Sequence, residues 1–170
     1  MIVTFLPFFL RPNIPKEGTP KGGTPESRVG PALKQINERE GGAIMFSGIC
    51  DRYPNTEDYH VAMAYVLEKH GADAQNRVAS RTFKGYFQDG IYPDETNLIS
   101  MIGEVIPDLD TAGLQADLRS ENKLVLVKAH AQEIANKFGI TSVPYFVMNG
   151  QFQFAGAQDP EYILAALEQA

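Results

Sequence analysis

Apolar and polar positions follow one another along this chain in a way that predicts a helical middle with strands towards both ends. Ile2–Phe9 is rich in β-branched and aromatic residues, which predicts a buried strand. Arg11–Pro25 contains four prolines and three glycines, so it is expected to be an irregular arm. Helical spacing, stop residues and N-caps (Asn55, Asp108 and Ser120) predict helices over 31–40, 56–70, 73–88, 94–105 and 121–138, with a short helix after Asp108.

The pattern changes from Val143 onward. Tyr145–Met148 and Gln151–Phe154 are predicted strands, and the dipeptide Asn149-Gly150 between them favours a two-residue type I′ turn. Asp159 followed by Pro160 predicts the start of a last helix, which continues through Leu167. The order of elements is therefore strand, several helices, hairpin and helix.

Composition narrows the classes of function. The 170 residues are enough for one ordinary domain, and 15 Lys+Arg against 21 Asp+Glu give a net charge of −6, which disfavours a nucleic-acid partner. Met1–Leu10 is apolar but lacks a basic start and a small-residue cleavage site, so export is not expected. The chain also has no apolar run of about 18 residues, and no membrane partner is expected.

The number and spacing of the cysteines and histidines bear on disulfide, redox and metal chemistry. Cys50 is the single cysteine, so the sequence contains no intramolecular disulfide, no Cys-x-x-Cys pair and no cysteine-rich zinc site. Cys50 is expected to be a small half-buried residue, with a mixed or intermolecular disulfide as the alternative and a catalytic nucleophile as the least favoured interpretation. His60, His70 and His130 share no metal-ligand spacing, so no metal site is expected, and His60 is expected to be a packed or capping residue.

Three further groups of residues have structural interpretations. Phe83, Tyr86 and Phe87 are spaced three and four apart on one predicted helix, which predicts a buried core stripe. Arg52 and Asp58 are expected to form a surface ion pair. Phe152 and Phe154 alternate with glutamines, as in an edge strand with one buried face.

Several segments together resemble the DsbA-like branch of the thioredoxin fold, in particular its cytoplasmic members associated with polyketide biosynthesis. The strand, the helical middle, the helix leading into Ser142-Val143-Pro144, the hairpin and the closing helix follow the plan of that branch. The segments that are similar to it are FFLRPNIPKEG at 8–18, RYPNTEDYH at 52–60, FKGYFQDG at 83–90 and GITSVPYFVMNGQFQFAG at 139–156.

The resemblance implies an α/β fold: a thioredoxin-like part formed by residues 1–25 and 120–170, with residues 26–119 as an inserted all-helical domain. In this family a first strand leads into a Cys-x-x-Cys at the start of the first helix, where the helix end favours the reactive thiolate. Nothing here matches that strand and helix, so the simplest expectation is a fragment or a truncated gene model. A chain starting at Met1 is otherwise expected to fold poorly, to pair with a partner, or to move its first strand into the vacant position.

The resemblance also supplies the expected site and ligands. It implies a cis peptide bond between Val143 and Pro144 and substrate binding at Val143, Pro144, Ala157 and Gln158, with no catalytic residue assigned. The corner around Arg52 and Asn55 is a further candidate for lining the cleft between the two parts. Expected ligands are a thiol-containing peptide or small molecule, with glutathione as one candidate and no cofactor. The implied location is cytoplasmic.

Two function classes stay open at this point. In the first, the chain is a member of the DsbA-like thiol-disulfide oxidoreductases that is inactive in dithiol chemistry, with a glutathione-binding transferase or isomerase-like domain as a variant. In the second, it is a non-catalytic binding or assembly module that completes its sheet with a partner chain, including a second copy of itself.

Overall fold

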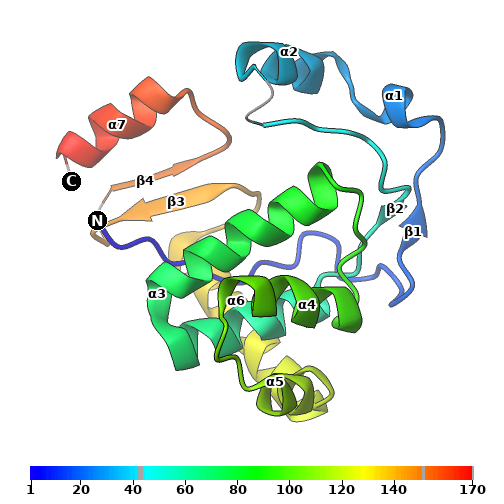
Figure 1. Ribbon diagram of the computed structural model, residues 1–170. Coiled ribbons are helices and arrows are strands. Elements are labelled where there is room, and N and C mark those ends of the chain that lie inside the picture. The colour runs from blue at the N-terminus through cyan, green and yellow to red at the C-terminus, as the bar shows by residue number, and fades with distance from the viewer. Residues whose placement is uncertain (42–43, 151, 170) are drawn as a thin grey trace.

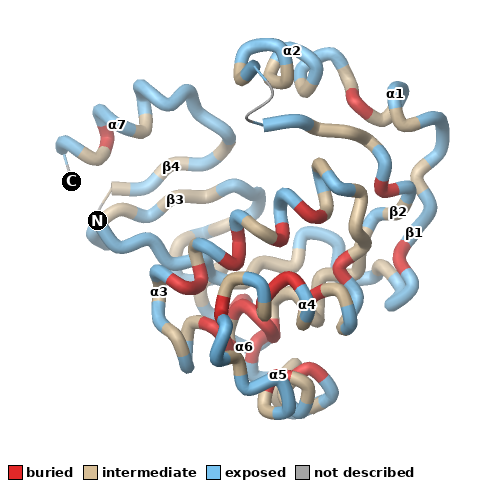
Figure 2. The backbone as a smooth tube through the Cα atoms, in the orientation of Figure 1, coloured by how far each residue is buried: buried red, intermediate tan, exposed pale blue. Residues whose placement is uncertain are grey.

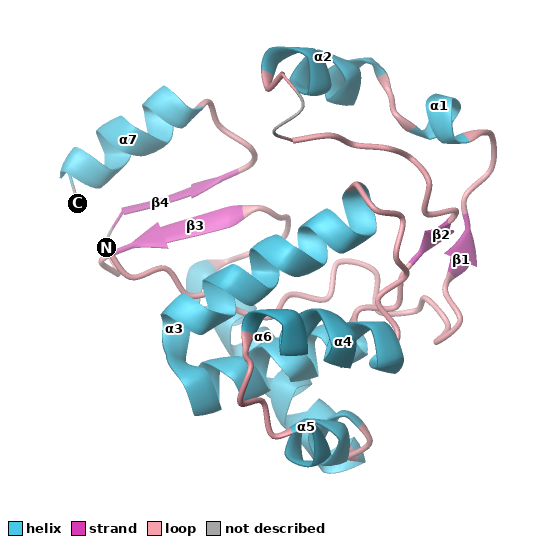
Figure 3. Cartoon of the chain, viewed as in Figure 1, coloured by secondary structure: helices cyan, strands magenta, loops and turns pink. Residues whose placement is uncertain are grey.

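Four helices form the body of the protein, and a hairpin with a final helix extends from it (Figures 1 and 3). The computed structural model describes residues 1–41, 44–150 and 152–169. The body consists of α3 (Glu57–Phe87), α4 (Glu95–Val105), α5 (Thr111–Leu118) and α6 (Glu121–Phe138). The other elements are β1 (Thr19–Pro20), α1 (Pro25–Arg28), α2 (Pro31–Arg39), β2 (Arg52–Tyr53), β3 (Tyr145–Met148), β4 (Phe152–Ala155) and α7 (Pro160–Gln169).

Short-range capping sets most helix ends where the sequence predicts them. Ser120 accepts a hydrogen bond from the Lys123 backbone N–H and begins α6, and Gly139 ends that helix with a φ of 64°. The predicted cap Asp108 is wrong, because the side chain of Asp110 caps α5 by accepting from the Gly113 N–H. Asp110 and Asp108 are equally good cap residues, and the path of the chain between α4 and α5 decides which one is used.

Gly71 divides α3 into two legs. Its φ of 80° and ψ of 178° interrupt the helix, as the predicted stop at His70-Gly71 implies. A backbone conformation with a positive φ of this size favours glycine, because a Cβ would be strained there. The break lets the chain reverse direction, so both legs of α3 contribute to one core.

The core lies among α3, α4, α5 and α6 (Figure 2). Val66 and Val78, from the two legs of α3, are fully buried together with Ile102 of α4 and Leu114 of α5. Val127 of α6 belongs to the same cluster, so α6 packs against helices of the expected insertion domain. The proposed boundary between residues 119 and 120 stays a prediction.

The predicted hairpin forms, but the connection between its strands is not the predicted two-residue turn. Tyr145 pairs with Ala155 and Met148 pairs with Phe152, whereas a two-residue turn would pair Met148 with Gln151. Asn149 and Gly150 both have the positive φ expected of that dipeptide, 49° and 72°. Gln151, the predicted first residue of the second strand, lies outside the described residues. The Tyr145 hydroxyl donates to the Phe138 carbonyl and ties the hairpin to the end of α6.

The predicted buried strand at Ile2–Phe9 is wrong. These residues have no strand partner among the residues the structure describes, and Met1 and Ile2 are 90% and 82% exposed. The segment, which we call the N-terminal arm (residues 1–11), instead lies along α3. The side-chain amide of Gln75 takes the place of a neighbouring strand: its Oε1 accepts from the Phe5 N–H at 2.9 Å and its Nε2 donates to the Phe5 carbonyl at 3.0 Å.

Gln75 is therefore a structural anchor for the arm. Its side chain is 1% exposed, and its Nε2 also donates to the Met63 carbonyl at 3.1 Å. A buried backbone group that loses its partner costs about 1–3 kcal/mol. The amide bonds to three backbone groups at once, and Asn76, which donates to the Val3 carbonyl, is a second contact that holds the arm against α3.

We expect Gln75→Ala to lower the free energy of unfolding by about 2–3 kcal/mol, because it leaves the N–H and carbonyl of Phe5 without their partner and removes the bond to the Met63 carbonyl. Urea denaturation followed by circular dichroism measures the change. Gln132→Ala is the matched control, because Gln132 is exposed on α6 and its side chain bonds to Asn136 alone among the described residues, so its loss is expected to cost less than about 0.5 kcal/mol. Equal costs for the two substitutions would contradict the anchoring role.

Candidate binding cavity

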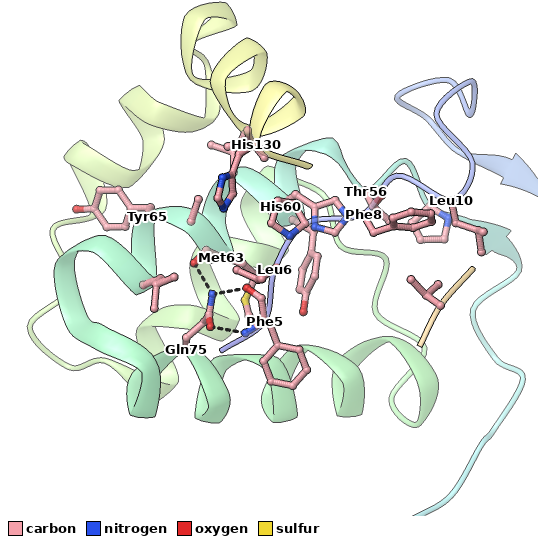
Figure 4. Close-up of a pocket in the computed structure, with 18 of the residues that line it drawn as sticks. Phe5, Leu6, Phe8, Leu10, Thr56, His60, Met63, Tyr65, Gln75 and His130 are labelled. Atoms are coloured by element: carbon pink, nitrogen blue, oxygen red, sulfur yellow. Dashed lines mark hydrogen bonds between the residues drawn. The ribbon is translucent and has the colours of Figure 1, made fainter. Parts of the chain in front are cut away.

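A large cavity lies between the N-terminal arm, α3 and α6 (Figure 4). Its volume is about 830 Å³, and we call it the main cavity. Most of its wall is apolar: Phe5, Leu6 and Phe8 of the arm face side chains of α3 such as Met63. Ligand sites in proteins have similar volumes and are similarly apolar with a few polar groups, so the main cavity has the size and character of a small-molecule site.

The aromatic side chains of the second leg of α3 line this cavity. Phe83 and Phe87 are 44% and 43% exposed, and Tyr86 is half-buried, so the prediction of a buried core stripe is wrong. The spacing places these three residues on one helix face, as predicted. The helical core packs on the Val78 side of the helix. The face that the three aromatic residues share points away from that core and towards the cavity.

His60 is packed in the wall between the arm and α3. Its ring centroid lies 4.7 Å from that of Phe9 and 5.5 Å from that of Tyr59. Burial among these rings lowers the pKa of His60 from 6.5 to about 4, although a hydrogen bond with the Phe8 backbone favours the protonated ring. His60 is therefore neutral near pH 7, in agreement with the predicted packed residue. Burial likewise raises the pKa of its neighbour Tyr59 to about 12.

Two cations and two tyrosines gather at one end of the main cavity. The Arg11 guanidinium carbon lies 4.7 Å from the centroid of the Tyr53 ring. The Lys21 Nζ lies 5.2 Å from the same centroid and 4.6 Å from that of Tyr86. Burial lowers the pKa of Lys21, an effect that the nearby Cys50 and Asp51 only partly oppose. We call these four residues the cationic end.

Cys50 lies outside the main cavity and lines a smaller one of about 360 Å³. Lys21 and Tyr86 line both cavities, so the two adjoin at the cationic end. Cys50 is 6% exposed and its Sγ donates to the Arg52 carbonyl at 3.7 Å. It is thus more buried than the half-buried residue expected from the sequence, and its thiol has little access to a macromolecular disulfide.

The expected ion pair between Arg52 and Asp58 is wrong. Arg52 donates to the backbone carbonyls of Glu17 and Gly18, and Asp58 pairs with Lys16 at 3.2 Å. Asn55 donates to the Ile14 carbonyl and accepts from the Glu57 N–H, although Thr56 is the N-cap position. This corner therefore joins the loop after the arm to the start of α3, and its neighbours Tyr53, Pro54 and Thr56 line the main cavity.

The residues expected to bind substrate are only partly brought together. Val143 lines the main cavity, and the Val143–Pro144 peptide bond is cis. The Pro144 carbonyl accepts from the Gly156 N–H at 2.8 Å, which places the turn before α7 beside it. Ala157 and Gln158 are exposed residues of that turn and lie outside the cavity wall, and Gln158 donates to the Ala155 carbonyl. Their role stays a prediction.

Sequence reasoning missed the arm, the cationic end and Gln75 as parts of this site. The sequence pattern shows the aromatic face of α3 and the proline-rich segment 11–25. Neither pattern indicates which distant segment that part of the chain will contact. Among the described residues no three His, Cys, Asp or Glu side chains are grouped so that they could hold a metal ion. No helix in the described part of the chain combines the length and apolarity needed to cross a bilayer.

The lowered pKa of His60 leads to a pH dependence of stability. Because the folded-state pKa is below that of the unfolded chain, the unfolded chain binds more protons between about pH 6.5 and 4. His60 is therefore expected to reduce stability as the pH falls through that window, by about 3 kcal/mol at most, and to contribute no loss above it. Urea denaturation at several pH values measures this, and His60→Gln is expected to flatten the profile. An unchanged slope in that variant would contradict the assignment.

Comparison with known proteins identifies the family to which this architecture belongs. The DSBA-like thioredoxin domain matches the chain over residues 2–168. A probable DsbA oxidoreductase from Streptomyces coelicolor has a similar structure, with a TM-score of 0.74 and 22% identity over 94% of this chain and 71% of that chain. No curated protein matches the sequence. The expected DsbA-like thioredoxin fold with a helical region is confirmed, and the chain belongs to the DSBA-like thioredoxin domain family.

Proposed function

We propose that this chain is the ligand-binding part of a DsbA-like thiol-disulfide oxidoreductase, that it takes an apolar ligand in the main cavity, and that its own residues perform no dithiol exchange. The observation that carries the proposal is the apolar cavity of about 830 Å³ that reaches Val143 while Cys50 lies outside it. Dithiol exchange ends with a second thiol attacking a mixed disulfide, and this sequence contains one cysteine.

The character of the wall supports an apolar ligand over glutathione. Phe83, Phe87 and Leu126 expose large apolar surfaces into the cavity, which a bound apolar body would cover. Glutathione carries two carboxylates and an ammonium group, and each would need a partner on leaving water. Glutathione binding at Val143, Pro144, Ala157 and Gln158 stays a narrower alternative.

The neutral fluorophore N-phenylnaphthylamine provides a direct test, because its emission rises when it enters an apolar site. Leu126 is 56% exposed on α6 and lines the cavity, so Leu126→Glu places a carboxylate in the wall. We expect this variant to bind the probe at least about tenfold more weakly, because the carboxylate must be desolvated when the probe binds.

Val125→Glu is the matched control. Val125 is 61% exposed at the preceding position of α6 and lies outside the cavity wall, so this variant is expected to bind the probe as the unmodified chain does. The unmodified chain is also expected to be inactive in insulin reduction. Activity that Cys50→Ala abolishes, or probe binding that Leu126→Glu leaves unchanged, would contradict the proposal.

One observation favours assembly through the sheet as a second candidate function. In the part of the chain that the structure describes, β3 pairs only with β4, so its other edge has no strand beside it. An unpaired edge with apolar side chains is a template for a strand of another chain. Val147 is the exposed residue in the middle of β3.

Sedimentation velocity over a range of concentrations tests assembly. If a second copy completes the sheet, the mass is expected to rise towards that of a dimer, and Val147→Lys is expected to shift the transition to higher concentration because edge lysines oppose pairing. A monomer at all concentrations would exclude self-assembly and leave the binding function as the one supported.

A further inference from the structure

We propose that the ligand of the main cavity is an elongated apolar monocarboxylate whose carboxylate binds at the cationic end, between Arg11 and Lys21. This inference rests on the proposed binding function and specifies the class of ligand.

Neither cation of the cationic end forms an ion pair with a carboxylate of the described residues, although the charge of Asp51 raises the pKa of Lys21 by the smallest of the effects that act on it. Among the ion pairs of the described residues, none involves Arg11 or Lys21. The hydrogen bond of the Lys21 Nζ goes to the Cys50 carbonyl at 3.2 Å, which is a neutral acceptor. This arrangement occurs in a chain with a net charge of −6, where carboxylates are in excess.

The other lysine in the cavity wall shows the contrast. Lys123 lies 3.0 Å from Asp117 and 3.7 Å from Glu68, and all three residues line the main cavity. The charge of Lys123 is thus compensated within the protein. The two ends of the cavity therefore differ, because one has an internally neutralised lysine and the other has two cations with space in front of them.

Burial destabilises the charged form of Lys21, which has no ion-pair partner among the described residues. Removal from water lowers the pKa of Lys21, which means that the charged form is less stable there than in water. The faces of Tyr53 and Tyr86 recover part of this cost through cation–π contacts. An incoming carboxylate would recover more, because charge-assisted hydrogen bonds are roughly twice as strong as neutral ones.

Much of the rest of the cavity offers no partner to a polar ligand. Beyond the cationic end, the wall includes apolar side chains such as Phe83, Phe87 and Leu126, and the amide of Gln75 is already bonded to Phe5 and Met63. The charged side chains of Lys123, Asp117 and Glu68, which also line the cavity, are paired with one another. A peptide would bring a backbone N–H and C=O at every residue, and these groups would find few partners here. A hydrocarbon chain with one carboxylate meets both the apolar wall and the charged end.

The experiment compares dodecanoate with methyl dodecanoate, both as competitors of N-phenylnaphthylamine. The two competitors have the same chain, and only dodecanoate carries a charge. We expect dodecanoate to bind at least about tenfold more tightly, the gain of one charge-assisted contact. Lys21→Gln and Arg11→Gln are each expected to remove most of that advantage while leaving the ester unchanged.

Two further variants keep the test sharp. Lys21→Arg retains the charge and is expected to restore the preference for the acid. Arg77→Gln is the control for loss of a positive charge, because Arg77 is exposed on α3 and lies outside both cavities. Its acid-to-ester ratio is expected to equal that of the unmodified chain.

The outcomes separate this inference from the function on which it rests. Equal affinity for acid and ester, or a ratio that Lys21→Gln does not change, would overturn the carboxylate proposal while the neutral probe still supports an apolar site. Failure of the neutral probe to bind would overturn both. Tighter binding of glutathione or of an end-capped apolar peptide than of dodecanoate would replace the proposed ligand class.

Discussion

The amide of Gln75 is the interaction on which the binding site depends. It pairs with both the N–H and the carbonyl of Phe5, as a neighbouring strand would, and so it helps to place the arm along α3. The arm supplies one wall of the main cavity, and α3 supplies the opposite wall together with Gln75 itself. One buried polar side chain thus connects the helical core to the site, since its third bond goes to Met63 in the first leg of α3.

The cavity also depends on how α3 uses its two sides. The side with Val78 packs into the core of α4, α5 and α6, and the side with Phe83 and Phe87 is left to face the arm. The break at Gly71 is what allows both legs of the helix to reach that core. The helix therefore has an apolar surface on two sides, and no helix of the described residues covers the second side. The result is an aromatic wall with exposed surface, which suits an apolar ligand.

Family membership and the chemistry of this sequence give different information. The match over residues 2–168 and the structural likeness establish a DsbA-like thioredoxin fold. The family fold alone does not assign a reaction, because function resides in the particular groups of a site. Here those groups are an apolar wall, a cationic end and one buried thiol outside the cavity, and they favour binding over exchange.

The sequence by itself determined the local structure. Ser120 and Gly139 mark the ends of α6, Gly71 breaks α3, and the segments on either side of Asn149-Gly150 form a hairpin. The sequence predicts these features because each depends on residues that are close together along the chain. Only the tertiary structure decided that residues 2–9 are an arm, that Phe83 and Phe87 line a cavity and that Arg52 bonds to carbonyls instead of Asp58. The physical reason is that each of these outcomes depends on a partner tens of residues away, as Gln75 is 70 residues from Phe5. No local pattern encodes which distant side chain will form a hydrogen bond with a buried backbone group or cover an apolar face.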